Sequence, residues 1–176
     1  YYYSFSGKRL LEKPLETMLE SNSPQFPFCL CWASENWTRR WDGRDNEILI
    51  SQNHSKKNDE TVIRDLIRYF KSTSYIKINN KPLLLVYGVD LFPNFKETAS
   101  TWRKICKSEG IGEIYLAMVE THELVHKNIQ PSFYGCDASI EFPPLNLGIT
   151  YNEKIDGIDK NFSGTINDYE ATMLSY

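Results

Sequence analysis

The sequence predicts an α/β fold: a partial (β/α)8 barrel in which parallel strands alternate with outer helices. Strand and helix patterns alternate along the chain, and the predicted strands are almost continuously apolar, as in parallel sheets buried on both faces. A closed barrel needs eight strand–helix units in roughly 250 residues, whereas 176 residues hold about five such strands. We therefore expect residues 1–176 to be a single domain, the middle fragment of a barrel that lacks both ends.

Short apolar runs predict the strands. Residues 26–32 form an uninterrupted apolar run, and the sequence PLLLVY at residues 82–87 has the same character. Runs of this length bounded by turn residues are typical of buried strands. The predicted strands are residues 1–5, 26–32, 82–87, 113–119 and 137–142.

Helical periodicity separates these strands. Apolar residues recur three and four positions apart in residues 10–21, and again in residues 58–70, where Asn58 is the predicted N-cap. A third helix is predicted over residues 94–108 and is ended by Gly110. A further helix is predicted from residue 169, and residues 145–168, rich in Gly, Asn and Asp, are predicted as loop.

Two parallel architectures fit this alternation, the doubly wound sheet and the barrel. A dinucleotide-binding doubly wound sheet would carry a glycine-rich phosphate turn after its first strand. The sequence has no such turn after any predicted strand. This weakens the nucleotide-binding version and leaves the barrel as the favoured interpretation.

Composition excludes several classes of function. The formal net charge is −3, whereas nucleic-acid-binding domains usually have a basic surface. There is no apolar run of about 20 residues, the length that a transmembrane segment needs. The four cysteines show no CxxC pair and no zinc-ligand spacing, so we expect free thiols, no metal, no cofactor and a cytoplasmic location. The chain starts at Tyr1 rather than at a methionine, so we expect the true N-terminus to be missing.

The most distinctive segment follows the second predicted strand, where parallel α/β proteins place their active sites. Three of the four tryptophans fall within ten residues there. Indole faces stack on sugar rings, while carboxylate, amide and guanidinium groups hydrogen-bond to hydroxyls. The alternative is a structural plug in which the tryptophans pack under the loop. The predicted sugar-binding residues are Trp32, Glu35, Asn36, Trp37, Arg39, Arg40, Trp41, Asp42, Tyr87 and Glu141.

Paired carboxylates are the usual machinery of glycosidic-bond cleavage. Glu35 and Glu141 each follow a predicted strand and are weak catalytic candidates, because a single glutamate at a strand end more often binds or braces. His122 and His126 lack a serine or cysteine nucleophile as partner. We expect Glu35 and Glu141 to share one face of the structure.

Several motifs resemble a known family, the bacterial WbsX-type glycosyltransferases, which are related to glycoside hydrolase family 99. The most specific are Phe26-Pro27-Phe28-Cys29-Leu30-Cys31-Trp32 and Glu35-Asn36-Trp37-Thr38-Arg39-Arg40-Trp41-Asp42-Gly43. Further matches are Tyr1-Tyr2-Tyr3, the stretch from Gly7 to Glu16, Tyr75-Ile76-Lys77, Lys81-Pro82-Leu83-Leu84, Trp102-Arg103 and Glu141-Phe142-Pro143-Pro144.

The resemblance implies a (β/α)8 barrel that acts on mannose-like or other glycans of polysaccharide or O-antigen gene clusters. It also implies catalytic carboxylates in an Asn-Glu-Trp-x-Glu-Gly stretch, which this chain does not contain. Departures from the family pattern occur at strand ends, where large or polar groups are lost. They are Ser4, Ser6, Ser34, Gly88 and Val89.

We therefore expect a carbohydrate-active protein, glycosidase-like or a glycosyltransferase, whose partners are a glycan substrate and the remaining barrel strands. The absence of a phosphate-binding loop favours hydrolase-like chemistry. The alternative is a non-catalytic glycan-binding module, and a purely structural barrel fragment is the third possibility. Because strands and carboxylates are missing, we expect residues 1–176 alone not to turn over glycans.

Overall fold

The computed structural model describes residues 1–21, 23, 25–42, 44–142, 148–151, 156–158 and 166–174. The chain forms two compact units, Tyr1–Ile140 and Glu141–Tyr176, and each is described by itself. The single domain expected over residues 1–176 stays a prediction.

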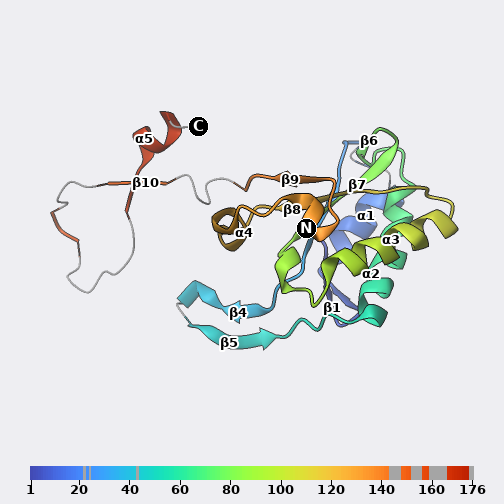
Figure 1. The fold of residues 1–176 in the computed structure, drawn as a ribbon, viewed down its shortest axis with the longest axis horizontal. Helices are drawn as coiled ribbons and strands as arrows, with labels where there is room; N and C mark the ends of the chain where they lie inside the picture. Colours follow the sequence, from blue (N-terminus) through green and yellow to red (C-terminus); the bar gives the residue numbers. More distant parts are fainter. Residues whose placement is uncertain are drawn as a thin grey trace. The chain divides into compact units, whose positions relative to one another are not determined.

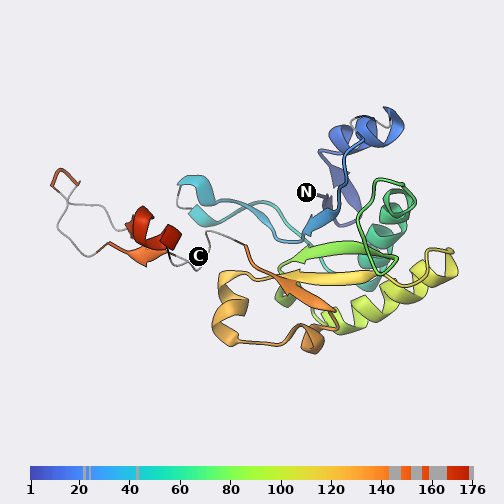
Figure 2. The same cartoon turned by 90° about the horizontal axis from the view of Figure 1, so that it is seen from above.

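The first unit is built on a parallel sheet whose strand order follows the order of the chain. Its strands are β3 (Leu30–Ala33), β7 (Lys81–Tyr87), β8 (Tyr115–Val119) and β9 (Ala138–Ile140) (Figure 2). The register places Trp32 of β3 opposite Val86 of β7. A short strand, β6 (Lys77–Ile78), pairs antiparallel with β7. Four of the five predicted strands are thus parallel members of this sheet.

The strand predicted at residues 1–5 behaves differently. Its main part, β1 (Tyr3–Phe5), forms an antiparallel hairpin with β2 (Lys8–Leu10). The turn residues Ser6 and Gly7 have φ of 50° and 83°, which is the backbone of a tight hairpin turn. Only Tyr2 joins the sheet, through a parallel bridge to Trp32. The expectation of a fifth parallel strand here is therefore wrong except at this one residue.

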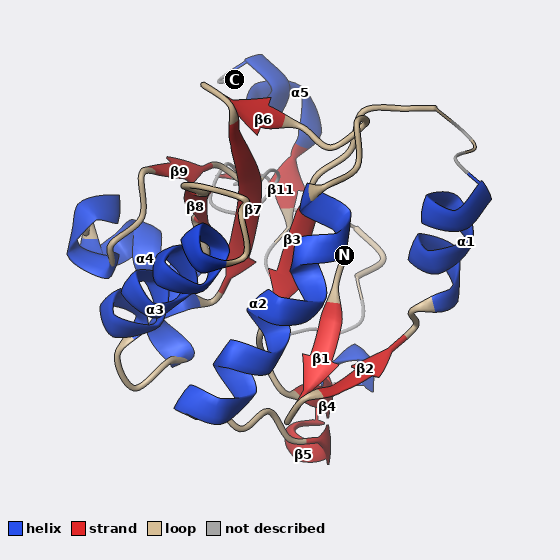
Figure 3. Cartoon of the chain, turned by 90° about the vertical axis from the view of Figure 1, so that its right-hand side faces the viewer, coloured by secondary structure: helices blue, strands red, loops and turns tan. Residues whose placement is uncertain are grey.

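Helices α2 (Lys56–Phe70) and α3 (Phe95–Ser108) pack against each other and cover the same face of the sheet (Figure 3). Asn94 caps α3 by accepting a hydrogen bond from the Glu97 N–H at 3.2 Å. For α2 the predicted cap is wrong. Ser55 is extended and caps the helix, while Asn58 lies inside the first turn and its amide donates to the Asn53 carbonyl.

The hydrophobic core lies between the sheet and these two helices. Strand side chains alternate between the two faces of a sheet, and in β7 the helix-facing residues Leu84 and Val86 are fully buried. Their neighbours Leu85 and Tyr87 face the other side and stay partly exposed. The apolar runs predicted burial on both faces, but within the described residues only the helix-covered face of β7 is closed.

An ion-pair cluster attaches the β1–β2 hairpin to α2. Arg9 contacts Asp65 at 3.2 Å and Glu16 of helix α1 (Lys13–Ser21) at 2.9 Å. The Tyr2 hydroxyl donates to Asp65 at 2.9 Å. This polar cluster fixes the N-terminal segment beside β3.

The long polar loop expected after β3 is a hairpin. Strands β4 (Trp37–Arg39) and β5 (Arg44–Ile50) pair antiparallel around the 3-10 turn η1 (Arg40–Asp42), and the hairpin extends away from the sheet (Figure 1). Shorter elements complete the unit: η2 (Val89–Leu91), α4 (His122–Lys127) and η3 (Pro131–Tyr134).

The second unit contains a short antiparallel pair, β10 (Ile149–Thr150) with β11 (Asn167–Asp168), followed by α5 (Tyr169–Leu174). The helix predicted from residue 169 is confirmed. The loop predicted over residues 145–168 is wrong at these two strands, and the rest of that segment lies largely outside the described residues. Among the helices of the described part of the chain, none is long and apolar enough to cross a membrane.

Candidate functional site

The base of the β4–β5 hairpin is closed by a hydrogen-bond chain. The Asn36 side-chain oxygen accepts from the Gln52 N–H at 2.6 Å, and the Gln52 amide donates to the Ser4 carbonyl at 2.6 Å. The Trp37 ring packs edge-on against Tyr3 and Phe5, with ring centroids 5.3 and 5.1 Å away. The hairpin is thus anchored to the N-terminal strand by both polar and aromatic contacts.

A cavity of about 490 Å³ lies along this hairpin, beginning at the carboxyl end of β3. Its lining includes the anchored Trp37 and also Trp41, which is 74% exposed. The two indoles therefore differ: one is partly buried and held by neighbours, and the other is open to solvent. The lining residues are Glu35, Asn36, Trp37, Thr38, Arg40, Trp41 and Leu49.

Electrostatic coupling connects three predicted site residues. Burial raises the pKa of the Glu35 carboxyl, and the nearby Arg40 guanidinium opposes this shift. Burial also raises the pKa of the Tyr87 hydroxyl, and the Glu35 charge adds to that rise. A half-buried carboxyl under the electrostatic influence of a guanidinium can donate or accept a hydrogen bond toward a polar ligand.

Trp32, Arg39 and Tyr87 are the predicted binding residues of the described part of the first unit that do not line the cavity. Arg39 pairs with Glu47 across the hairpin at 2.9 Å, which is a bracing contact. Asp42 ends η1, and its side chain lies outside the described part of the structure. Glu141 is the first residue of the second unit, so its pairing with Glu35 stays a prediction.

Trp32 belongs to the core rather than to the cavity. It is 1% exposed, and its ring packs against Phe92, His54 and Trp102 on the helix-covered side of β3. Alternation along the strand decides this, because Trp32 points to the same face as Leu30. The expectation that Trp32 offers its ring to a sugar is therefore corrected: no face of the indole is accessible.

The sequence interpretation missed Thr38 and Leu49 in the cavity wall. The signal for Leu49 was present, since the run Ile48-Leu49-Ile50 ends the segment taken as a polar loop and is typical of a strand. Leu49 is 55% exposed and adds an apolar side chain to the cavity lining. Tyr3 and Phe5, which hold Trp37 in place, lie more than thirty positions away in the chain, so no local pattern pointed to them.

No grouping of three or more His, Cys, Asp or Glu side chains with metal-ligand geometry occurs among the described residues. The four cysteines are free thiols. Burial raises the pKa of Cys31 to about 12, so its thiol is protonated near neutral pH and is not an activated nucleophile.

The fold and the cavity define the class: an α/β protein with a pocket of indole, carboxyl and guanidinium groups where a parallel strand ends. Residues 1–176 match the family model described as Glycosyltransferase WbsX, and the chain belongs to this family. This agrees with the resemblance carried by the tryptophan- and arginine-rich motif.

Two curated relatives, both described as uncharacterized protein WxcX, come from two strains of Xanthomonas campestris pathovar campestris. Each is 41% identical to this chain over 173 residues, which is 96% of the chain and 24% of the relative. The chain thus spans about a quarter of the length of the relatives it matches. No solved structure matches the chain.

Proposed function

We propose that this chain contributes the glycan-contacting hairpin of a carbohydrate-active protein in polysaccharide biosynthesis. The protein acts on glycosidic bonds of bacterial polysaccharide or O-antigen type glycans. The observation that carries the proposal is the cavity of about 490 Å³ in which Glu35, Arg40 and the exposed Trp41 are brought together. Membership of the WbsX family supports the same class of substrate.

The cavity chemistry suits a sugar. Trp41 keeps most of its indole in water, and a pyranose ring placed against it would bury apolar surface on both partners. Glu35 and Asn36 can accept hydrogen bonds from hydroxyls, and Arg40 can donate to ring or phosphate oxygens. Leu49, which also lines the cavity, can supply a second apolar contact.

A partial barrel remains the proposed architecture of the first unit. The parallel strands follow chain order, and α2 and α3 lie on one face, which is how consecutive strand–helix units are arranged in a barrel. The partly exposed face of β7 is where a barrel interior would be. Additional strands would have to cover that face in a closed barrel.

For catalysis, we propose Glu35 as a proton donor or hydrogen-bonding group, because a raised pKa keeps a carboxyl protonated closer to neutral pH. Glycosidases pair two carboxylates, and Glu141 stays the proposed second one.

The rival is a non-catalytic glycan-binding module. It is favoured by one observation: among the described residues that line the cavity, Glu35 is the single carboxylate.

The test is binding of mannose-containing oligosaccharides and of an O-antigen polysaccharide, measured by titration calorimetry and by saturation-transfer NMR. We expect binding that Trp41→Ala weakens and that Phe133→Ala leaves unchanged, since Phe133 is a similarly exposed aromatic on η3. Because residues 1–176 alone are expected not to turn over glycans, the reaction is tested in a longer chain that includes the remaining barrel strands. There, release of reducing sugar, or transfer from a sugar nucleotide, separates hydrolase from transferase. Binding without either reaction supports the non-catalytic module. Equal binding by the Trp41→Ala and Phe133→Ala variants would exclude the hairpin as the glycan-binding site.

A further inference from the structure

A groove with mainly cationic side chains runs along the outer face of α3. Its volume is about 380 Å³, which lies within the range of roughly 300–1,000 Å³ that is typical of small-molecule pockets. Four cationic side chains and one carboxylate line it, although the formal net charge of the whole chain is −3. The lining residues are Lys96, Ser100, Arg103, Lys104, Lys107, Glu113 and Gly135.

The spacing along α3 explains why these side chains gather. Lys96, Ser100 and Lys104 stand four residues apart in the sequence, so they lie on one face of the helix. Lys107 continues this face toward the end of α3. All four residues are exposed, whereas Trp102 on the other side of the helix is buried in the core. The cationic face is therefore accessible from solvent.

Arg103 holds the two walls of the groove together. Its guanidinium donates to the Gly135 carbonyl and to the Asp137 carboxylate, each at 2.9 Å, and its side chain is 24% exposed. Gly135 has φ of 75°, and a Cβ atom there would lie 3.3 Å from the Lys96 Cγ atom. The chain after η3 therefore lies close against α3 and forms the second wall.

The lysines of the groove differ from Arg103 in their partners. Among the ion pairs between described residues, none includes Lys96, Lys104 or Lys107. The carboxylate in the lining, Glu113, lies 3.9 Å from the Arg103 Nε atom. Arg103 and Lys107 are four residues apart, where like charges destabilise a helix. A bound anion would relieve this repulsion and would give the ammonium groups an acceptor.

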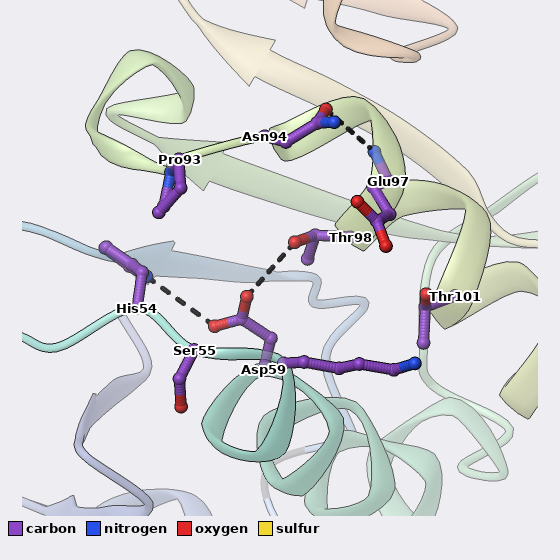
Figure 4. A pocket seen from close by; sticks show the side chains of 9 residues that line it. His54, Ser55, Asp59, Pro93, Asn94, Glu97, Thr98 and Thr101 are labelled. Carbon is purple, nitrogen blue, oxygen red and sulfur yellow. Dashed lines mark hydrogen bonds and ion pairs between the residues drawn. The ribbon is translucent and has the colours of Figure 1, made fainter.

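A second hollow, at the first turn of α3, has a different balance of charge. Its cavity of about 130 Å³ is lined by Lys56 and by the carboxylates of Asp59 and Glu97 (Figure 4). Asp59 lies 3.6 Å from the His54 Nδ1 atom and accepts a hydrogen bond from the Thr98 hydroxyl at 3.1 Å. Two carboxylates beside one lysine repel an anion. Lys56 is therefore a matched control for the lysines of the groove.

The chemistry of the groove favours a phosphate group as its ligand. A phosphate carries up to two charges and several acceptor oxygens, so one group can contact more than one ammonium and also the Ser100 hydroxyl. None of the described residues that line the groove is aromatic, so the groove offers no stacking surface to a sugar ring or a nucleic-acid base. The hairpin cavity, with two indoles in its lining, is different in this respect.

We propose that the outer face of α3 binds a phosphate-bearing ligand through Lys96, Lys104 and Lys107, with the Ser100 hydroxyl as a further donor. Arg103 positions the walls and adds its charge. Phosphate is the chemistry shared by two sources, a soluble phosphorylated molecule and the headgroup of an anionic lipid. This site is separate from the hairpin cavity and does not rest on the proposed function.

The first experiment titrates the intact protein with inorganic phosphate at low ionic strength, where screening is weak, and follows the phosphorus-31 line width. Malonate, a dicarboxylate of similar charge, is then added as a competitor. We expect saturable phosphate binding that malonate displaces poorly. Lys104→Gln should weaken the binding about fivefold, as expected for the loss of one charged contact.

Two further variants fix the location of the site. Glu113→Gln removes the carboxylate from the lining and should tighten phosphate binding about twofold, because it removes a repulsion. Lys56→Gln is the matched control and should leave the affinity unchanged. All three substituted residues are exposed, so the variants should keep the fold, and thermal melts on the same samples check this.

Sedimentation with phosphatidylglycerol vesicles, compared with uncharged phosphatidylcholine vesicles, identifies the source of the phosphate. Retention on the anionic vesicles that Lys104→Gln reduces assigns the site to a lipid headgroup. Binding of inorganic phosphate without such retention assigns it to a soluble ligand. If the parent protein binds neither probe, if Lys104→Gln and Lys56→Gln behave alike, or if malonate displaces phosphate at equal concentration, the lysines only solvate the helix and the phosphate site is overturned.

Discussion

Two tryptophans nine positions apart show how one aromatic-rich motif serves two regions of the molecule. Trp32 is 1% exposed and packs between the sheet and the helices, whereas Trp41 is 74% exposed and lines the hairpin cavity. The first region is a packed core in which every ring is surrounded by other side chains. The second is a solvent-facing pocket held by a hairpin. Residue type alone therefore does not separate a core residue from a candidate ligand contact.

The largest expected difference between the two regions is in stability. Trp32→Ala should lower the free energy of unfolding by about 3–5 kcal/mol, because it leaves a cavity in the core. Trp41→Ala should change it by less than about 0.5 kcal/mol, because the ring is mostly in solvent. Urea unfolding of both variants gives the comparison. Equal losses would mean that the hairpin is a structural plug.

Glycan binding, unlike stability, should depend on the residues of the hairpin cavity rather than on the core. Glu35→Gln or Trp37→Ala should weaken glycan binding about tenfold, since a pocket group contributes roughly 1–3 kcal/mol when its partner is buried. Glu35→Gln should leave thermal stability almost unchanged. Trp37 contacts Tyr3 and Phe5, so a sharp fall in melting temperature with intact affinity would identify Trp37 as a brace. Calorimetric titration and thermal melts on the same samples separate these outcomes.

The adjacent arginines provide a finer contrast within the hairpin. Arg40→Ala should weaken glycan binding and should raise the pKa of Glu35 further, because Arg40 lowers it in the intact protein. Arg39→Ala removes a partly exposed pair with Glu47 and should cost less than about 1 kcal/mol, with affinity retained. Carboxyl titration by NMR measures the first effect. Identical behaviour of the two variants would remove the distinction between lining and bracing residues.

The smallest expected effect is the dependence of stability on the ionisation of Glu35. Its folded pKa lies above the ordinary value of 4.5 because burial disfavours the charged form. The folded state therefore holds its proton to higher pH than the unfolded state. Stability should fall slightly as the pH rises through the window between the ordinary and the raised pKa. Glu35→Gln should lack this decrease, and unfolding measured at closely spaced pH values checks it. A rise in stability across that window would contradict the burial of the carboxyl.

The central strands and helices were predictable because their signals are local. The apolar run over residues 82–87 became β7, and the stripe of Val62, Ile63 and Leu66 became the buried side of α2. The hairpin β4–β5 was missed because most of its residues are polar and its apolar residues Ile48 and Leu49 are exposed, so it lacks the alternation that a half-buried strand shows. The turn at Ser6 and Gly7, with positive φ at both residues, changed the predicted first strand into a hairpin.

By itself, the sequence determined the alternating α/β pattern, the family and the composition of the motif that follows β3. Those properties depend on residue type and on spacing along the chain. The tertiary structure alone decided which of these residues line the cavity and which are buried, because that depends on which face of β3 a residue occupies. It also placed His54 behind Ser34 and beside Asp59. Their contacts arise only when the segment after β5 folds back against the end of β3.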